Sequence, residues 1–176
     1  SKTYLAKNNN LMLRYKSLRQ FNKKFVAVIM FREPLAHAQS LLHQHQNFVR
    51  QQDDDPFVFR YMNWLGHFEF GQGHKPFRFA SHADQGTQDT DHIDYWLQSW
   101  IDYYGYLLNF VNDENLILVN YQDYLEKPND TLTRLFGHLE LPAPNPQSKF
   151  TKKTEEIKLD YDHTLAKKAN QIYEDL

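Results

Sequence analysis

Apolar positions along the chain follow helical spacing in some stretches and form short continuous runs in others. Residues 10–21 carry an apolar residue every three or four positions, which predicts a helix with one apolar face. Residues 25–31 are apolar without interruption, which is typical of a strand covered on both faces of a parallel sheet. Pro34 then begins a second predicted helix, which keeps its spacing up to the polar stretch 51–55.

The second half repeats this order of helix and strand. Residues 56–86 are rich in aromatics and turn formers, and a helix followed by a loop is one assignment for them. Residues 90–111 have the apolar stripe of a long amphipathic helix, and 116–119 form a second short apolar run. Further helices are predicted over 128–139 and 165–176.

Strands that alternate with helices predict an α/β fold with a parallel sheet flanked by helices. We expect one domain over residues 1–176, a length that one hydrophobic core can serve. Two strands are too few for a sheet in a domain of this size, so we expect the sheet to be incomplete.

Composition narrows the class of protein. With 41% hydrophobic residues the chain is not a disordered polymer, and no apolar run approaches the roughly 20 residues that cross a bilayer. The absence of cysteine excludes disulfides, thiolate metal sites and a cysteine nucleophile. We therefore expect a globular protein that does not cross a membrane, in the cytoplasm.

The net charge of −2 hides an uneven distribution. Residues 1–50 contain nine basic side chains and one acidic side chain, Glu33, so this quarter carries +8 and the rest −10. This segregation favours an anion as the partner of the first quarter: a phosphorylated small molecule, a nucleic acid or an acidic protein. A solvated basic helix face is the alternative.

Arg32 and Ser40 are the strongest candidates for binding chemistry. Arg32 follows the first predicted strand, and ligands of open parallel sheets bind beyond the carboxyl ends of the strands. A guanidinium can bind two phosphate oxygens, and a hydroxyl and a helix N-terminus can complete an anion site. The alternative is that Arg32 is paired with Glu33 and that Ser40 has no role.

The order of these motifs resembles the sulfotransferase family that uses 3′-phosphoadenosine-5′-phosphosulfate (PAPS). The resemblance begins at residues 4–10, continues through the first helix and strand to Arg32-Glu33-Pro34 and Ser40, and extends over the aromatic helix to Tyr121 and Asp123. It implies a P-loop-NTPase-like sulfotransferase fold and transfer of a sulfuryl group to a hydroxyl or amine without a metal. It also implies that Arg32 and Ser40 bind the 3′-phosphate of the cofactor, with Glu33 in place of the family's usual Asp.

Two departures from the family pattern change what is expected. The glycine-rich loop that holds the 5′-phosphosulfate has no counterpart, so the chain resembles the C-terminal portion of a sulfotransferase and is expected to be inactive alone. Family members acting on hydroxyls carry a Lys-x-His whose histidine takes the proton of the acceptor. Lys7 and Asn9 stand there, and because an amide is no base, His37 and His67 are the candidates to replace it. Lys7 is expected to stabilise charge on the sulfuryl oxygens.

The resemblance assigns two further regions. Lys152 and Lys153 are candidate counterparts of the basic loop that closes over the 3′-phosphate, with a solvated loop as the alternative. Residues 51–88 are the expected substrate-specificity region, for a small-molecule or glycan acceptor. A metal site is not expected, because His43 and His45 stand two residues apart and point to different sides of a helix.

Two other functions remain open from the sequence. A relative of the same topology could transfer phosphoryl groups, and a non-catalytic module could bind nucleic acid or an acidic partner through the basic first quarter, although nucleic acid is not the partner we favour. The unpaired sheet edge is expected to be covered by a missing N-terminal segment or by self-association.

Overall fold

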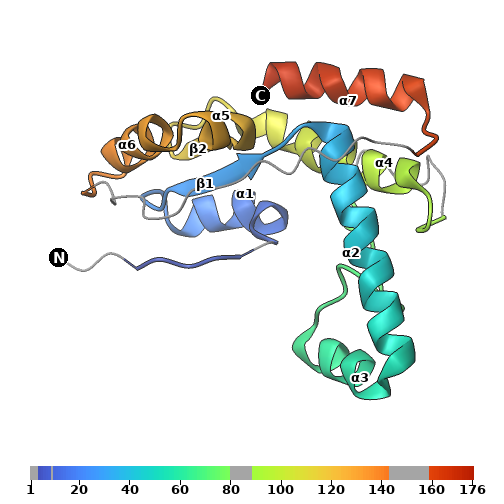
Figure 1. Ribbon diagram of the computed structural model, residues 1–176. Coiled ribbons are helices and arrows are strands. Elements are labelled where there is room, and N and C mark those ends of the chain that lie inside the picture. Colours follow the sequence, from blue (N-terminus) through green and yellow to red (C-terminus); the bar gives the residue numbers. More distant parts are fainter. Residues whose placement is uncertain (1–3, 9, 80–88, 143–158) are drawn as a thin grey trace.

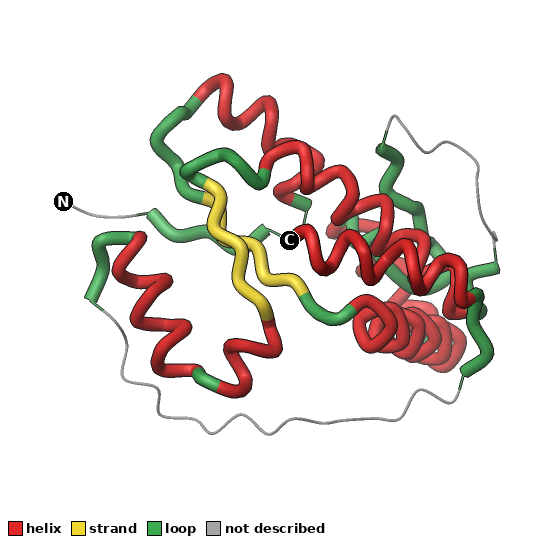
Figure 2. Tube along the Cα trace, turned by 90° about the horizontal axis from the view of Figure 1, so that it is seen from above, coloured by secondary structure: helices red, strands yellow, loops and turns green. Residues whose placement is uncertain are grey.

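The structure is a computed structural model that describes residues 4–8, 10–79, 89–142 and 159–176. Its elements, in chain order, are α1 (Leu11–Phe21), β1 (Ala27–Phe31), α2 (Pro34–Asp54), α3 (Pro56–Leu65), α4 (Ile93–Leu107), the 3₁₀ turn η1 (Leu108–Phe110), β2 (Leu116–Asn120), α5 (Tyr121–Glu126), α6 (Pro128–His138) and α7 (His163–Asp175). The predicted α/β architecture is confirmed, with a small parallel sheet flanked by helices (Figures 1 and 2).

The sheet consists of β1 and β2 in the described part of the chain. The two strands are parallel, with Ala27 opposite Leu116 and Phe31 opposite Asn120. Helices α2, α3 and α4 lie between them in the sequence, as a parallel pair requires a crossover. Both strands therefore end at the same edge of the sheet, directly before α2 and α5.

One sheet face is covered and the other is largely open along β1. Ala27, Ile29 and Phe31 are buried, whereas Val28 and Met30 are 41% and 48% exposed. The prediction that residues 25–31 form a strand covered on both faces is therefore wrong: the apolar run is continuous, but the described helices leave the Val28 and Met30 face partly exposed. The strand also begins at residue 27 instead of 25.

Helix α4 forms the centre of the core. Its residues Trp96, Trp100 and Tyr104 are buried, as their helical spacing predicts, and α2 and α7 pack against it. The hydroxyl of Tyr104 donates a hydrogen bond to the carbonyl oxygen of Met30 at 3.3 Å. This bond ties the long helix to the carboxyl end of β1.

Helices α2 and α3 form an arm that extends away from the sheet (Figure 1). Helix α2 continues through the polar stretch where the sequence predicted its end, and Asp55 then breaks it and caps α3 by accepting from the backbone N–H of Phe57. Gly66, with φ of +70°, ends α3. At 1.5 Å per residue, α2 holds α3 about 30 Å from the sheet.

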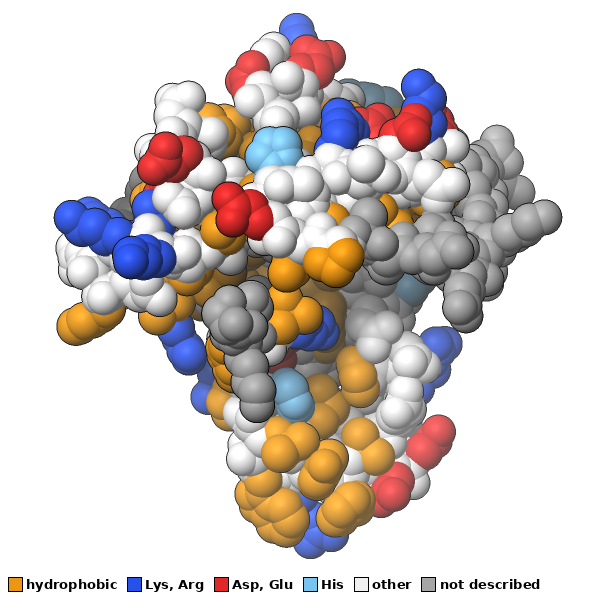
Figure 3. Space-filling model, turned by 90° about the vertical axis from the view of Figure 1, so that its left-hand side faces the viewer, with side chains coloured by type: hydrophobic (Ala, Val, Ile, Leu, Met, Phe, Trp, Pro, Cys, Tyr) orange, Lys and Arg blue, Asp and Glu red, His pale blue; other side chains and the backbone are white. Residues whose placement is uncertain are grey.

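The end of the arm carries an exposed apolar stripe on α3. Its members recur at helical spacing and include Trp64, which is 75% exposed: Phe57, Tyr61, Trp64 and Leu65. Hydrophobic side chains gather over this end of the molecule in Figure 3. No helix in the described ranges has both the length and the apolar character that crossing a bilayer requires.

Candidate functional site

The carboxyl ends of β1 and β2 bring Arg32 and Tyr121 together. Because Phe31 and Asn120 are paired in the sheet, the residues that follow them lie side by side, and the Arg32 Cζ atom lies 5.5 Å from the centre of the Tyr121 ring. Among the described residues, no carboxylate forms an ion pair with Arg32. The face of the Tyr121 ring stabilises the Arg32 guanidinium without neutralising it, so its positive charge can bind an anion.

Glu33 occupies the N-terminus of α2 with its own side chain. Its carboxylate accepts hydrogen bonds from the backbone N–H groups of Leu35 at 3.0 Å and Ala36 at 2.6 Å. The prediction that this helix N-terminus would help to bind an external anion is therefore wrong, because those donors are already satisfied. The same bonds direct the Glu33 carboxylate to the helix rather than into an ion pair with Arg32.

Ser40 and His37 lie on the Glu33 side of α2. Seven residues make nearly two helical turns, so Ser40 is exposed about 10 Å further along the helix than Glu33. His37 lies between them, and its Nδ1 atom is buried without a hydrogen-bond partner in the described structure. Burial, with a smaller effect of the Arg32 charge, lowers the pKa of His37 to about 4. The ring is therefore neutral at physiological pH.

The other predicted site residues lie away from this edge or outside the described residues. Lys7 is exposed, and nearby Asn10 donates a hydrogen bond to Glu69 at 3.4 Å, which places this segment beside the loop after α3. His67, exposed in that loop, has its Nδ1 atom 3.6 Å from the Glu69 carboxylate. Asn9, Lys152 and Lys153 lie outside the described residues.

Tyr173 of α7 closes the same edge of the sheet. Its ring packs edge-on against Phe31 at 5.6 Å, and its hydroxyl accepts a hydrogen bond from the Asn120 amide at 2.9 Å. Asn120 also accepts from the backbone N–H of Gln122 and so begins α5. The C-terminal helix is thereby fixed to the ends of both strands.

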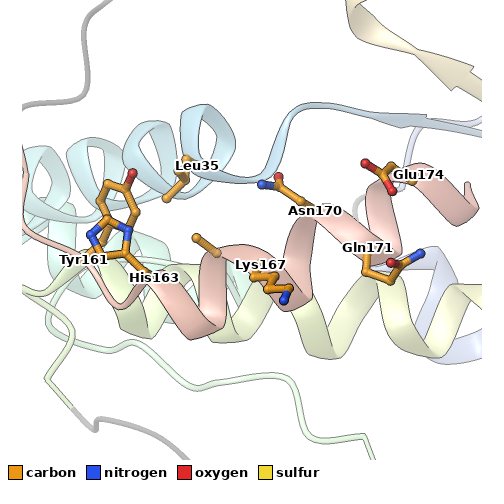
Figure 4. A pocket seen from close by; sticks show the side chains of 8 residues that line it. Leu35, Tyr161, His163, Lys167, Asn170, Gln171 and Glu174 are labelled. Atoms are coloured by element: carbon orange, nitrogen blue, oxygen red, sulfur yellow. The ribbon is translucent and has the colours of Figure 1, made fainter.

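A groove runs from this edge along α7 (Figure 4). It has a volume of about 430 Å³ and lies between Leu35, in the first turn of α2, and the polar side of α7. Asn170 and Glu174 line the part nearest the turn between β1 and α2 in Figure 4. The sequence pattern did not point to this groove, although polar residues at 163, 167, 170 and 174 have the spacing of one helix face.

The sequence also did not reveal a contact at the base of the arm between two histidines, the buried His45 and the half-buried His74. Nε2 of His74 lies 2.6 Å from the Tyr95 hydroxyl, and its Nδ1 faces the carbonyl oxygen of Phe68. Nδ1 of His45 accepts from the backbone N–H of Gly71, and burial lowers the pKa of both histidines. The pair holds the loop after α3 against α2 and α4, which is a structural role.

No metal centre is formed within the described ranges. His45 is buried and His43 is exposed, so the two point to different sides of α2 as their spacing predicts. In those ranges no three histidine, aspartate or glutamate side chains are grouped closely enough to hold a metal ion.

Comparison of the chain with protein-family models, with curated proteins and with solved structures gave no match in any of the three.

Proposed function

We propose that this chain is a sulfotransferase-like domain whose Arg32 binds the 3′-phosphate of PAPS. The observation that carries the proposal is the position of Arg32: it ends a parallel strand, stacks on Tyr121, and has no carboxylate partner among the described residues. Ligands of open α/β sheets bind at this edge of the sheet.

The Arg32 guanidinium offers paired N–H donors to a phosphate at this edge. The exposed Ser40 hydroxyl, about 10 Å further along α2 than Glu33, is the predicted second contact. Asn9, Lys152 and Lys153 remain predicted contacts of the nucleotide or the sulfuryl group. Lys7 is proposed to stabilise charge on the transferring group.

PAPS, when bound, supplies the sulfuryl group: a bond forms between the acceptor oxygen and sulfur, the sulfur–oxygen bond to the 5′-phosphate breaks, and the acceptor proton is released. His37 and His67 are the candidates to take that proton. Both are imidazoles. Burial lowers the pKa of His37 to about 4, so its ring is unprotonated at neutral pH but is a weak base. The sequence holds no glycine-rich loop for the 5′-phosphosulfate, so the 176-residue chain is expected to bind weakly and to transfer no measurable sulfuryl group.

Residues 51–88 remain the proposed substrate-specificity region, with a constraint from the arm. Because α2 separates α3 from Arg32 by about 30 Å, the exposed α3 stripe can touch only a long acceptor, such as an oligosaccharide or a protein chain. A small acceptor must be bound by residues near the edge of the sheet.

Titration of the chain with adenosine 3′,5′-bisphosphate, the product of sulfuryl transfer, tests the proposal by NMR. We expect binding in the millimolar range, with shifts of the backbone signals of residues 32–40. Arg32→Ala should weaken binding at least about tenfold, since a charge-assisted hydrogen-bond pair is lost.

Arg14→Ala is the matched control, because Arg14 is an exposed cation of the basic first quarter on α1. It should leave the affinity within about twofold of the unchanged chain. Equal losses from both substitutions, together with steep salt dependence on random oligonucleotides, would instead indicate binding by diffuse positive charge and would contradict the proposal.

A further inference from the structure

The groove between α2 and α7 has a wall of hydrogen-bonding groups built on one helix. Lys167, Asn170 and Glu174 follow each other at steps of three and four residues and are exposed. The opposite side of α7 is apolar: Ala169 is buried and Ile172 packs against the core. One face of the helix is thus fixed in the core while the other holds donors and acceptors along the groove.

Aromatic and small residues complete the groove. The Tyr161 ring is half-buried against the core and edge-on to His163 at 4.9 Å, so its orientation is set by packing. Ala166 and Leu35 add small apolar surfaces. A rigid aromatic ring beside several amide and charged groups is suited to a sugar, whose C–H face packs on a ring while its hydroxyls both donate and accept hydrogen bonds.

The charge of the groove selects against other ligands. The positive charge of Lys167 is offset by the negative charge of Glu174 on the same face of α7. The lining therefore offers no positive field for a polyanion such as nucleic acid. Its apolar part is limited to Leu35, Ala166 and the Tyr161 ring, which is too little for a lipid chain or an amphipathic helix. A neutral polyhydroxylated ligand matches both features.

The groove also meets the edge of the sheet where Arg32 lies. Leu35 follows Arg32 by three residues, and Glu174 follows Tyr173, whose hydroxyl is bonded to Asn120 at the end of β2. Leu35 and Ser40 lie on different sides of α2, since five residues rotate by about 140°. A ligand in the groove and a phosphate on Arg32 and Ser40 therefore occupy different sides of the same turn.

We propose that the α2–α7 groove binds a neutral oligosaccharide, at a site separate from the proposed nucleotide site on Arg32 and from the proposed specificity region 51–88. The oligosaccharide ring stacks on Tyr161, its hydroxyls bond to Asn170 and Lys167, and its end near Glu174 approaches the Arg32 turn.

The test is a titration of the ¹⁵N-labelled chain with lactose, cellobiose and N,N′-diacetylchitobiose at millimolar concentrations. We expect at least one of them to shift the backbone signals of residues 161–174. Asn170→Ala and Lys167→Ala should each weaken that binding about fivefold. Both side chains are exposed, so these variants keep the fold, which the same spectra verify.

Asn129→Ala and Phe21→Ala are the matched controls, an exposed amide on α6 and an exposed aromatic at the end of α1. They should not change saccharide binding. Absence of shifts in 161–174 with all three saccharides, or equal weakening by the control variants, would overturn the inference.

Adenosine 3′,5′-bisphosphate in the same samples separates the two proposals. Binding of nucleotide and saccharide together, without displacement, supports both. Nucleotide binding without any saccharide shift overturns the groove site and leaves the proposed function standing. Saccharide binding without nucleotide binding supports the groove as a sugar site and contradicts the proposed function. Displacement of the saccharide by the nucleotide would show that both bind at one site and would overturn the separate saccharide groove.

Discussion

Three histidines lie where the charged imidazolium is disfavoured. Burial lowers the pKa of His37 to about 4 and also lowers the pKa of His45 and of His74. In the unfolded chain each has a pKa near 6.5, so between that value and the folded pKa the unfolded state binds more protons. Their contribution to stability is therefore complete above about pH 6.5 and is lost as the pH falls.

We expect the free energy of unfolding to decrease between pH 7 and pH 5, measured by urea denaturation. For His37 alone the decrease at pH 5 is at most about 2 kcal/mol, as each pH unit between the two pKa values contributes about 1.4 kcal/mol. His37→Gln should flatten this pH dependence, whereas His43→Gln, at an exposed site on the same helix, should not. A pH profile unchanged by His37→Gln would contradict the burial of a neutral ring.

The sequence identified Arg32 but not its surroundings. A basic residue after an apolar run is visible in the sequence, because strand ends follow from local pattern. Tyr121 and Tyr173 come from segments far along the chain. The strand register brings Tyr121 to Arg32, and the packing of α7 brings Tyr173 to Phe31. The sequence left a Glu33–Arg32 pair open as an alternative, because the capping role of Glu33 depends on the backbone angle at the start of α2.

Helices were predictable where their ends carry local signals. Pro34 and Pro56 both begin helices, and Asp55 caps the second one. The short helix α5 was missed because Tyr121–Glu126 has no apolar stripe, and its start depends on the Asn120 cap. The prediction that β1 is covered on both faces failed for another reason. An apolar run shows that a strand can be covered on both sides, but the number of layers that cover it depends on the whole fold.

Gly71 lies against Gln52 of α2, so a substitution at Gly71 tests how the loop after α3 is attached to that helix. Its φ is +80°, and a Cβ placed there would lie 2.5 Å from Oε1 of Gln52. Gln52 is buried and accepts a hydrogen bond from the backbone N–H of Gln72 at 2.7 Å, so its side chain cannot move without losing that bond. Gly71→Ala is expected to lower the free energy of unfolding by about 2–4 kcal/mol.

Gly66 provides the matched comparison. Its φ of +70° is similar, but a Cβ there meets nothing within 4 Å. Gly66→Ala should therefore cost only the backbone preference, about 1–2 kcal/mol. Equal losses from the two substitutions in urea or thermal denaturation would show that the Gln52 contact does not matter.

At the scale of the whole molecule, the open face of β1 is the feature most exposed to unwanted contacts. Val28 and Met30 present apolar surface beside an edge with no strand partner in the described residues. Such an edge promotes pairing with another chain. We therefore expect the purified 176-residue chain to self-associate at high concentration.

Met30→Lys should reduce this association, as measured by light scattering, with a change in stability within about 0.5 kcal/mol. The side chain already meets solvent, and the bond from Tyr104 goes to the backbone of residue 30. Ile29→Lys, one residue away on the buried face, should unfold the protein instead. Undiminished association of Met30→Lys would show that another surface, such as the α3 stripe, makes the contact.

The pairing of Ala27 with Leu116 also sets an order of events during synthesis. About 90 residues separate the partners, and a ribosome adding about 5–20 residues per second needs roughly 5–20 seconds to deliver the second strand after the first. During that interval β2, the strand that pairs with β1 in the described residues, has not been made, while α2 and α3 are already complete and can fold locally. A chaperone is therefore expected to bind the nascent chain most readily in the interval after β1 is made and before β2 is made.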